Sequence, residues 1–175
     1  MNVPALRTER LVLRGLERHD TEAIVRVFAE PEMSRYFAAD FSDPVQCREM
    51  VERRLAYTGP AGTGHWVLEL GGEVVGLAHL RPTKELPGHL PEIGYFVGRA
   101  YAGRGLATEA AAALLRHGFG ALDLPTIWAL IHESNVASRK LVRRLGFLDV
   151  GGGEHYGGPH RVYVAIRQPH GNLAA

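Results

Sequence analysis

The sequence predicts a mixed α+β domain, because strand-like and helix-like segments alternate along its 175 residues. Three observations indicate this most clearly. Residues 92–110 pass from a strand through a glycine-rich bend into alanines and leucines at helical spacing. Residues 126–147 repeat this order, with a β-branched and aromatic strand before a second helix. The pair Gly71-Gly72 lies between two apolar segments and is typical of a β-hairpin.

The first half of the chain is expected to contain three strands and two helices. The strands are predicted at residues 11–16, 65–70 and 74–80. One helix begins at Asp20 and runs toward Pro31, and the other opens at Pro44 after a loop rich in aromatic residues. The apolar residues that give these segments a helical pattern are Ala23, Ile24, Val27, Phe28, Met50, Val51 and Leu55. Both helices therefore have one face suited to packing on a sheet.

The second half is expected to contain four strands, at residues 92–97, 126–132, 147–150 and 161–167. A longer connection at 82–91 leads into it. The helix after Asn135 carries an apolar line of Ala137, Leu141 and Leu145 and ends at Gly146. Residues 151–158 are predicted to form a glycine-rich connection, and residues 169–175 a frayed tail.

Gly103 and Gly105 predict an anion site at the start of the helix that follows them. Glycine adopts backbone angles closed to other residues and lets a ligand approach, while free amides and the helix dipole favour negative charge. A P-loop needs Gly-Lys-Ser or Gly-Lys-Thr, whereas Leu106 and Ala107 follow here. The third glycine of a dinucleotide-binding loop is also missing. The pattern indicates a diphosphate site without metal ligands, to which Arg104 can add charge.

Composition favours one small domain, predicted at residues 1–168. The net charge of +1 and the pI near 8.0 argue against a dedicated nucleic-acid binder. Cys47 is the only cysteine, which excludes an intramolecular disulfide and a multi-cysteine zinc site, and no metal is expected. The charged N-terminus has no long apolar segment, so we expect neither a secretory signal nor a membrane span. A cytoplasmic protein is predicted.

The glycine loop resembles the acyl-coenzyme A signature of the GNAT superfamily of N-acetyltransferases, whose pattern is Gln/Arg-x-x-Gly-x-Gly/Ala. In this chain Ala102 occupies the first position, where it departs from the pattern, and Gly105 and Ala107 match the two small positions. Backbone amides hold most of the pyrophosphate in this family. The departure at Ala102 therefore leaves the resemblance intact.

A second motif resembles the branch that contains ribosomal-protein-alanine N-acetyltransferases. Asn135-x-x-Ser138 is followed after seven residues by Gly146-Phe147, as in the motif after the fifth strand of that branch. The opening residues 8–14, Thr-Glu-Arg-Leu-Val-Leu-Arg, are also typical of it. The resemblance covers nearly the whole chain.

The resemblance implies a three-layer fold with a twisted, mostly antiparallel mixed sheet of six or seven strands and about four helices. It also implies that strands 92–97 and 126–132 splay apart and that acetyl-coenzyme A, the cosubstrate, lies between them. The residues implied to contact this cosubstrate are Phe96, Val97, Gly103, Arg104, Gly105, Leu106, Ala107, Thr108 and Asn135. The first two would offer backbone groups to the pantetheine arm, and Gly103 to Thr108 would hold the pyrophosphate.

Acetyl transfer to an amine needs a proton acceptor, and the resemblance places Glu92 in that role, directly or through water. Pairing of Glu92 with an arginine is the structural alternative. His79 and His132 are competing bases, because histidine titrates in a useful range. For the acid, the position of the tyrosine used by many family members is Val142, which leaves Ser138 as the group facing the leaving thiolate.

Three functions remain open. The first is acetylation of a primary amine at a protein or peptide N-terminus, and the second is the same reaction on a small amine such as an aminoglycoside, a polyamine or an amino acid analogue. An acidic cleft would favour the polycations, and an open groove would favour a peptide. The third is a non-catalytic acyl-coenzyme A sensor, against which Glu92, Asn135 and Ser138 argue. Neither a nucleic-acid nor a membrane partner is expected, and the chain is predicted to be a monomer or a homodimer.

Overall fold

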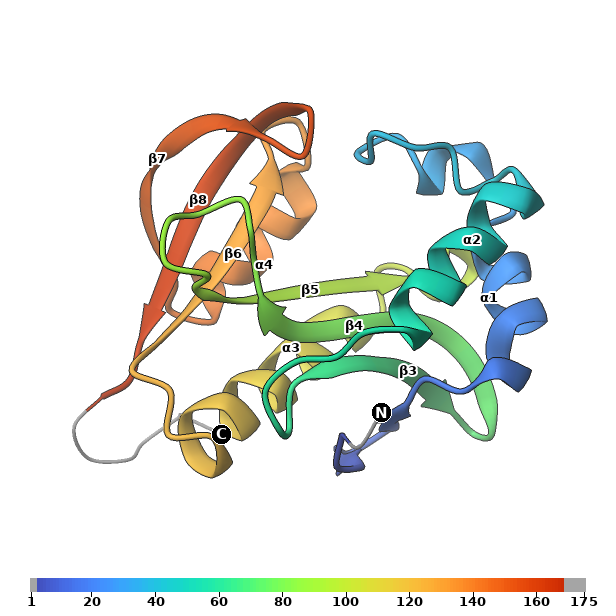
Figure 1. Ribbon diagram of the computed structural model, residues 1–175, viewed down its shortest axis with the longest axis horizontal. Helices are drawn as coiled ribbons and strands as arrows, with labels where there is room; N and C mark the ends of the chain where they lie inside the picture. The colour runs from blue at the N-terminus through green and yellow to red at the C-terminus, as the bar shows by residue number, and fades with distance from the viewer. Residues whose placement is uncertain (1–2, 169–175) are drawn as a thin grey trace.

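The computed structural model describes residues 3–168, which form an eight-stranded sheet with helices on both faces (Figure 1). The strands are β1 (Leu6–Arg7), β2 (Leu11–Gly15), β3 (Gly64–Leu70), β4 (Glu73–Pro82), β5 (Pro91–Val97), β6 (Thr126–His132), β7 (Leu148–His155) and β8 (Gly158–Ile166). Their order is β1-β2-β3-β4-β5-β6-β8-β7, and all neighbours are antiparallel except β5 and β6. The predicted mixed, mostly antiparallel sheet is confirmed, with the two-residue β1 added at its edge.

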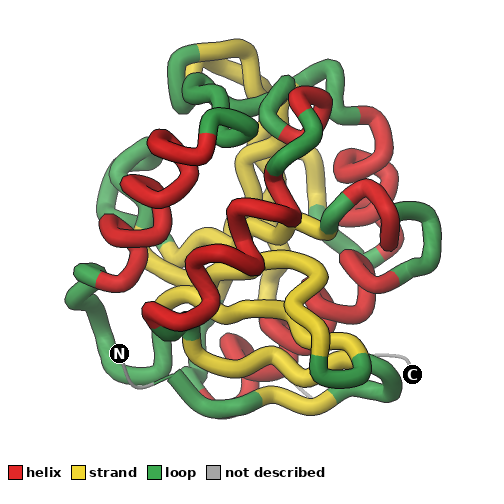
Figure 2. The backbone as a smooth tube through the Cα atoms, turned by 90° about the vertical axis from the view of Figure 1, so that its right-hand side faces the viewer, coloured by secondary structure: helices red, strands yellow, loops and turns green. Residues whose placement is uncertain are grey.

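Helices α1 (Thr21–Phe28) and α2 (Pro44–Leu55) cover one face of the sheet. Helix α3 (Leu106–Arg116) covers the other face, with α4 (Val136–Arg144) beside it. In Figure 2 the face covered by α1 and α2 is turned to the viewer, and helices cross in front of the strands. The predicted three layers are confirmed. Within the described residues, no helix is long and apolar enough to cross a membrane.

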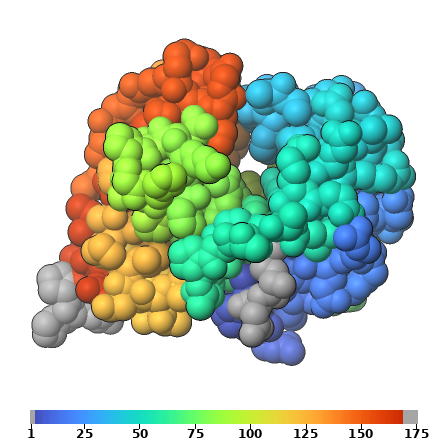
Figure 3. Space-filling model, viewed as in Figure 1, coloured from blue at the N-terminus to red at the C-terminus, as the bar shows by residue number. Residues whose placement is uncertain are grey.

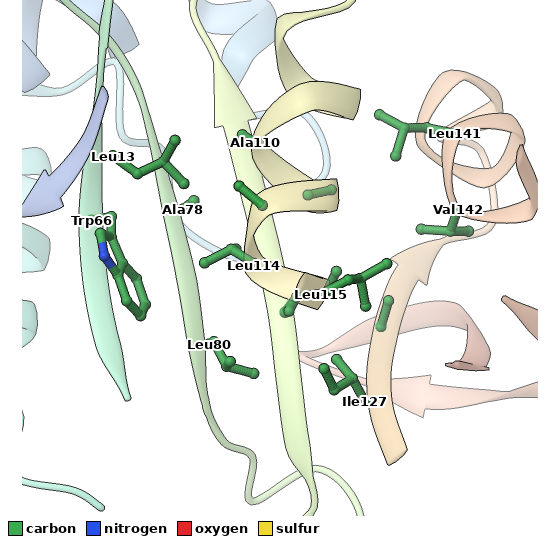
Figure 4. Packing of buried hydrophobic residues seen from close by; sticks show 14 of the residues in the cluster. Leu13, Trp66, Ala78, Leu80, Ala110, Leu114, Leu115, Ile127, Leu141 and Val142 are labelled. Carbon is green, nitrogen blue, oxygen red and sulfur yellow. The ribbon is translucent and has the colours of Figure 1, made fainter. Parts of the chain in front are cut away.

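Alternation along the strands divides the core between these two faces. Val67 and Leu77 point toward α1 and α2, whereas Trp66 and Ala78 point toward α3. Figure 4 shows Trp66 and Ala78 near Leu114 of α3. Trp66 is fully buried, and its indole N–H donates to the Pro4 carbonyl at 2.8 Å. Burial of each such large side chain contributes about 2 kcal/mol to folding, so the central strands form a rigid support for the site.

Two tight hairpins organise the sheet. The predicted Gly71-Gly72 turn is confirmed, with φ angles of +59° and +87° that suit a type I′ turn. The second hairpin joins β7 to β8 through Tyr156 and Gly157, whose φ angles are +51° and +77°. The prediction of a connection at residues 151–158 was therefore wrong. Glycine can pair through its backbone in an edge strand, and β8 supplies that pairing.

Strands β5 and β6 diverge from a single point of contact. Their only register pair among the described residues is Glu92 with Trp128, and in Figure 1 β5 then runs to the right while β6 rises. The predicted splay of strands 92–97 and 126–132 is confirmed. The side of β5 that faces β6 keeps backbone groups without a strand partner. The predicted tail, residues 169–175, lies outside the described residues.

Candidate active site

The phosphate loop has the backbone that the glycines predict. Gly105 is the N-cap of α3 and has φ +78°, and Gly103 has φ +75°. The first helical hydrogen bond runs from the Glu109 N–H to the Gly105 carbonyl at 3.0 Å. The three amides before Glu109, those of Leu106, Ala107 and Thr108, therefore lack a partner within the helix. Such free amides at the positive end of a helix dipole favour an anion.

Arg10, in the N-terminal segment, bonds to this loop and to the helix that follows it. Its Nη1 donates to the Arg104 carbonyl at 2.8 Å, and its Nη2 lies 2.7 Å from Glu109 Oε2. Thr8 also donates to Glu109. Burial alone would raise the pKa of Glu109, but these hydrogen bonds outweigh it and lower the pKa. The role of Arg10 was missed, because its partner lies 99 residues away and the opening motif carried no structural explanation.

The N–H and C=O groups along β5 alternate in direction, and this alternation decides which of them face the opening between β5 and β6. The Gly98 N–H donates to the Val75 carbonyl of β4 at 2.8 Å, and Phe96 is in register with Leu77. Backbone groups alternate in direction, so those of Phe96 face β4, while those of Tyr95 and Val97 face β6. The backbone groups of β5 available to a cofactor in this opening are therefore those of Tyr95 and Val97, and the backbone contact expected of Phe96 stays a prediction that this direction does not favour. The Phe96 ring instead stacks on Phe28, with centroids 3.8 Å apart.

A cavity of about 610 Å³ fills the opening beside this backbone. It is bounded by β4, β5, β6, the end of α2, residues 36–41 and the β7–β8 turn. Figure 3 shows the surface hollowed between the orange C-terminal strands and the cyan segment. The predicted residues Glu92, Phe96, Asn135 and Ser138 all line the cavity, as do the competing bases His79 and His132. The phosphate loop lies outside this lining.

Glu92 lies buried in the cavity wall with 3% of its surface exposed. The Tyr156 hydroxyl donates to Glu92 Oε2 at 2.5 Å and lies 3.1 Å from the Thr83 hydroxyl. Burial raises the pKa of Glu92, while the bond from Tyr156 and the nearby Arg81 oppose this shift. Burial and the Glu92 charge raise the pKa of Tyr156 to about 12, so the phenol keeps its proton at neutral pH.

Tyr156 is a site residue that sequence reasoning missed. It occupies the first position of the β7–β8 turn, where a positive φ is uncommon for tyrosine. The turn brings its hydroxyl to a glutamate 64 residues away. No local pattern around Tyr156 indicates this contact.

The two candidate histidines differ in environment. The His79 ring packs directly over Gly94 of β5, so that a Cβ atom added at Gly94 would lie 2.2 Å from the ring. Burial lowers the pKa of His79 well below its ordinary value, so it is a weak base. The Nδ1 atom of His132 accepts from the Ser134 N–H at 3.2 Å, and its ring lies 5.4 Å from that of His160. Neither histidine has a carboxylate partner among the described residues.

The start of α4 borders the same cavity. Asn135 is the N-cap that the sequence predicts, and its Oδ1 accepts from the Ser138 N–H at 3.1 Å. The Tyr95 hydroxyl donates to the Ser138 carbonyl at 3.4 Å. Leu141 and Leu145 of the expected apolar line pack against the core, and the fully buried Val142 lies beside them, whereas Ala137 is exposed, so the expected line is wrong only at Ala137. No group of three or more possible metal ligands is found within residues 3–168.

The comparisons with known proteins identify the family of this chain. Residues 10–148 match the family model described as an acetyltransferase (GNAT) domain. The uncharacterized N-acetyltransferase p20 of Bacillus licheniformis is 33% identical over 145 residues, which cover 81% of each chain. Spermidine N(1)-acetyltransferase of Escherichia coli K12 is 26% identical over 136 residues, covering 77% of this chain and 71% of that one.

A solved structure extends the comparison to the fold. Ribosomal-protein-S5-alanine acetyltransferase from Vibrio fischeri superposes with a TM-score of 0.76 at 18% identity, covering 95% of this chain and 98% of that one. The family match, together with this fold, defines an acyl-coenzyme A-dependent transferase. The chain belongs to the GNAT family and is an acetyl-CoA-dependent N-acetyltransferase.

Proposed function

We propose that acetyl transfer takes place in the opening between β5 and β6, and that the acceptor is the α-amine of a protein or peptide N-terminus. The observation that carries this proposal is the placement of Glu92 inside a cavity beside the splayed strands. The cavity is large enough for an extended segment of a peptide. The fold of the Vibrio fischeri enzyme, which is named for a ribosomal-protein alanine, supports the same acceptor class.

We propose that coenzyme A is held mainly by backbone groups. The free amides of Leu106, Ala107 and Thr108 suit the pyrophosphate, because a helix N-terminus favours an anion. Arg104, which makes no ion pair with another described residue, adds a charge-assisted contact. Tyr95 and Val97 offer strand-like pairing to the pantetheine arm. When bound, acetyl-coenzyme A supplies the activated acetyl group.

In this proposal Glu92 receives the proton that the acceptor amine must lose. A buried carboxyl with a raised pKa is a stronger base than an ordinary carboxylate once it is ionised. Tyr156 holds the carboxylate in place and keeps its own proton. His79, with its lowered pKa, is less suited to this role.

The leaving thiolate needs a hydrogen-bond donor at the start of α4. Ser138 lines the cavity, and its side chain makes no hydrogen bond to another described residue, so its hydroxyl is available. Asn135 has a mainly structural role in this proposal, since its side chain caps the helix that presents Ser138.

A small amine is the second candidate acceptor, and the relative named for spermidine supports it. A polyamine, however, binds best to carboxylates, and Glu92 is the only one among the described residues that line the cavity. We further propose one domain over residues 1–168, supported by the continuous sheet and the family match over residues 10–148. A cytoplasmic location, and the choice between monomer and homodimer, stay predictions.

The test is release of coenzyme A thiol from acetyl-CoA with a panel of acceptors. Peptides that begin with alanine or serine are compared with aminoglycosides, polyamines and amino acids. We expect turnover to be greatest with a peptide. Turnover confined to polyamines would contradict the proposed acceptor, and silence with every amine despite tight cofactor binding would contradict catalysis in this cavity.

A further inference from the structure

One end of the cavity carries positive charge that the proposed reaction does not use. Arg54 comes from the last turn of α2 and Arg81 from β4, and both line the cavity. The charged lining is otherwise limited to Glu92 and the more exposed Arg53. The arginine surplus makes this end attractive to an anion and repulsive to a polycation.

Arg54 and Arg81 line the cavity without a carboxylate partner among the described residues. Several arginines outside the cavity pair with carboxylates, for example those that bond Glu109, Asp20, Glu69, Glu22 and Asp149, whereas others, such as Arg104, have no such partner among the described residues. Within residues 3–168, neither Arg54 nor Arg81 has a carboxylate oxygen within 4.0 Å of its side-chain nitrogens. Arg81 donates to the Pro82 carbonyl at 3.2 Å and to the Tyr156 hydroxyl at 3.4 Å. The side chain of Arg54 makes no hydrogen bond to a described residue.

The arrangement has an electrostatic cost. Burial and the nearby Arg81 lower the pKa of Arg54 to about 10. Arg54 therefore stays protonated at neutral pH, although two cations share a partly desolvated wall. Such a pair is stabilised when an anion binds between or beside the two groups. A guanidinium also offers the planar donor pattern that a carboxylate accepts.

We propose that Arg54 and Arg81 bind a carboxylate carried by the acceptor, so that the substrate class is amines bearing an acidic group close to the reacting nitrogen. This rests on the proposed function, because the amine must reach Glu92. Arg81 is in register with Glu92, and cross-strand neighbours lie about 5 Å apart. The carboxylate therefore lies within one or two residues of the acetylated amine.

The carboxylate can come from an acidic side chain near a peptide N-terminus or from a free amino acid. The test uses two tripeptide amides of nearly equal shape, Ser-Glu-Ala and Ser-Gln-Ala, and free glutamic acid. Binding to the coenzyme A-loaded protein is measured by calorimetry, and turnover is measured by thiol release. We expect the Glu peptide to bind at least 10-fold tighter than the Gln peptide. Stronger binding of glutamic acid than of either peptide would support the inference and identify the free amino acid as the source.

Arg54→Gln is expected to abolish the preference for the Glu peptide, and Arg54→Lys, which keeps the charge, to retain most of it. Arg48→Gln is the matched control, since Arg48 lies on the same helix but pairs with Glu22 outside the cavity. It should leave the preference unchanged.

Equal binding of the two peptides to the parent protein would overturn the inference, as would a preference that survives Arg54→Gln. The readouts separate this inference from the proposed function. A binding preference without turnover supports the anion site and contradicts the proposed catalysis. Equal turnover and equal binding of both peptides support the catalysis and contradict the anion site.

Discussion

The two ends of the opening between β5 and β6 are built from different parts of the chain. At the end proposed to bind the cofactor phosphates, called the phosphate end, the donors are backbone amides of three consecutive residues, 106–108, which follow one left-handed glycine. At the acceptor end, the groups are side chains from α2, β4, β5 and the β7–β8 turn. The first end depends on local backbone geometry, and the second depends on the assembled fold.

This difference determines how each end responds to mutation. Apart from the charge that Arg104 adds, a side-chain change at the phosphate end matters mainly where it alters the backbone or blocks an approach to it. A change at the acceptor end alters charge and proton affinity in a buried place, where each effect is larger than in water. Mutations at the phosphate end should therefore change mainly cofactor binding, and mutations at the acceptor end should change mainly turnover.

The largest expected effect is at the acceptor end. Glu92→Gln preserves shape but removes the base, and we expect kcat to fall by about 10²- to 10⁴-fold. Because burial disfavours the ionised carboxyl, folding stability of the parent decreases as pH rises from the ordinary glutamate pKa to the raised one. The variant should be at least as stable as the parent at neutral pH. An unchanged kcat would exclude Glu92 as the base.

The parent should show the same group in its pH profile. Only ionised Glu92 accepts a proton, so kcat/KM should rise with pH through an apparent pKa above the ordinary value of glutamate. Glu92→Gln should lose this rise along with the activity. A parent profile that is flat from acid to neutral pH would contradict the assignment.

The next effect belongs to the phosphate end. Gly105→Ala forces a side chain into φ +78°, with its Cβ 3.4 Å from an Arg10 nitrogen, at a cost of about 1 kcal/mol. We expect coenzyme A to bind about 10-fold more weakly, by calorimetry, because the amides lose their alignment. Gly71→Ala, with φ +59° in a distant hairpin, is the matched control for strain. Equal losses of coenzyme A affinity in the two variants would contradict the role given to the phosphate end.

A smaller effect is expected at Ser138. Ser138→Ala removes one hydrogen bond to the leaving thiolate, and we expect kcat to fall by about 10-fold while the coenzyme A Kd is unchanged. The backbone N–H of Ser138 still bonds Asn135, so the helix start survives. Equal turnover in the variant and the parent would remove Ser138 from the mechanism.

The smallest effect sharpens the role of the β7–β8 turn. The hydrogen bond from Tyr156 lowers the pKa of Glu92, so Tyr156→Phe should raise it further. The acid limb of kcat/KM should then move to higher pH while the plateau changes little. A limb that stays in place would show that Tyr156 has only a structural role.

The sequence predicts the phosphate end because its cause is local. Gly105, the helix after it and the Gly71-Gly72 hairpin are specified by neighbouring residues, and they form as expected. The Asn135 cap is found for the same reason. The backbone direction of Phe96 was not found, since it depends on the register with β4, which no local pattern fixes.

The acceptor end was predicted only in part. Glu92 was found through a family resemblance, but Tyr156, Arg54 and Arg81 reach it from segments far apart in the chain. Residues 151–158 were predicted as a connection because they are rich in glycine, which is typical of loops as well as of edge strands. The turn that carries Tyr156 was therefore not predicted. Knowledge of the pairing between β7 and β8 is needed to place that hydroxyl.

The central claim is that coenzyme A lies in the opening between β5 and β6, with its arm paired to the backbone of β5. A crystal structure of the complex with coenzyme A tests it most directly. We expect the pyrophosphate at the amides of residues 106–108 and the pantetheine arm hydrogen-bonded to Tyr95 and Val97, with the sulfur between Glu92 and Ser138. A cofactor bound outside this opening, or paired to the backbone of Phe96, would contradict the account.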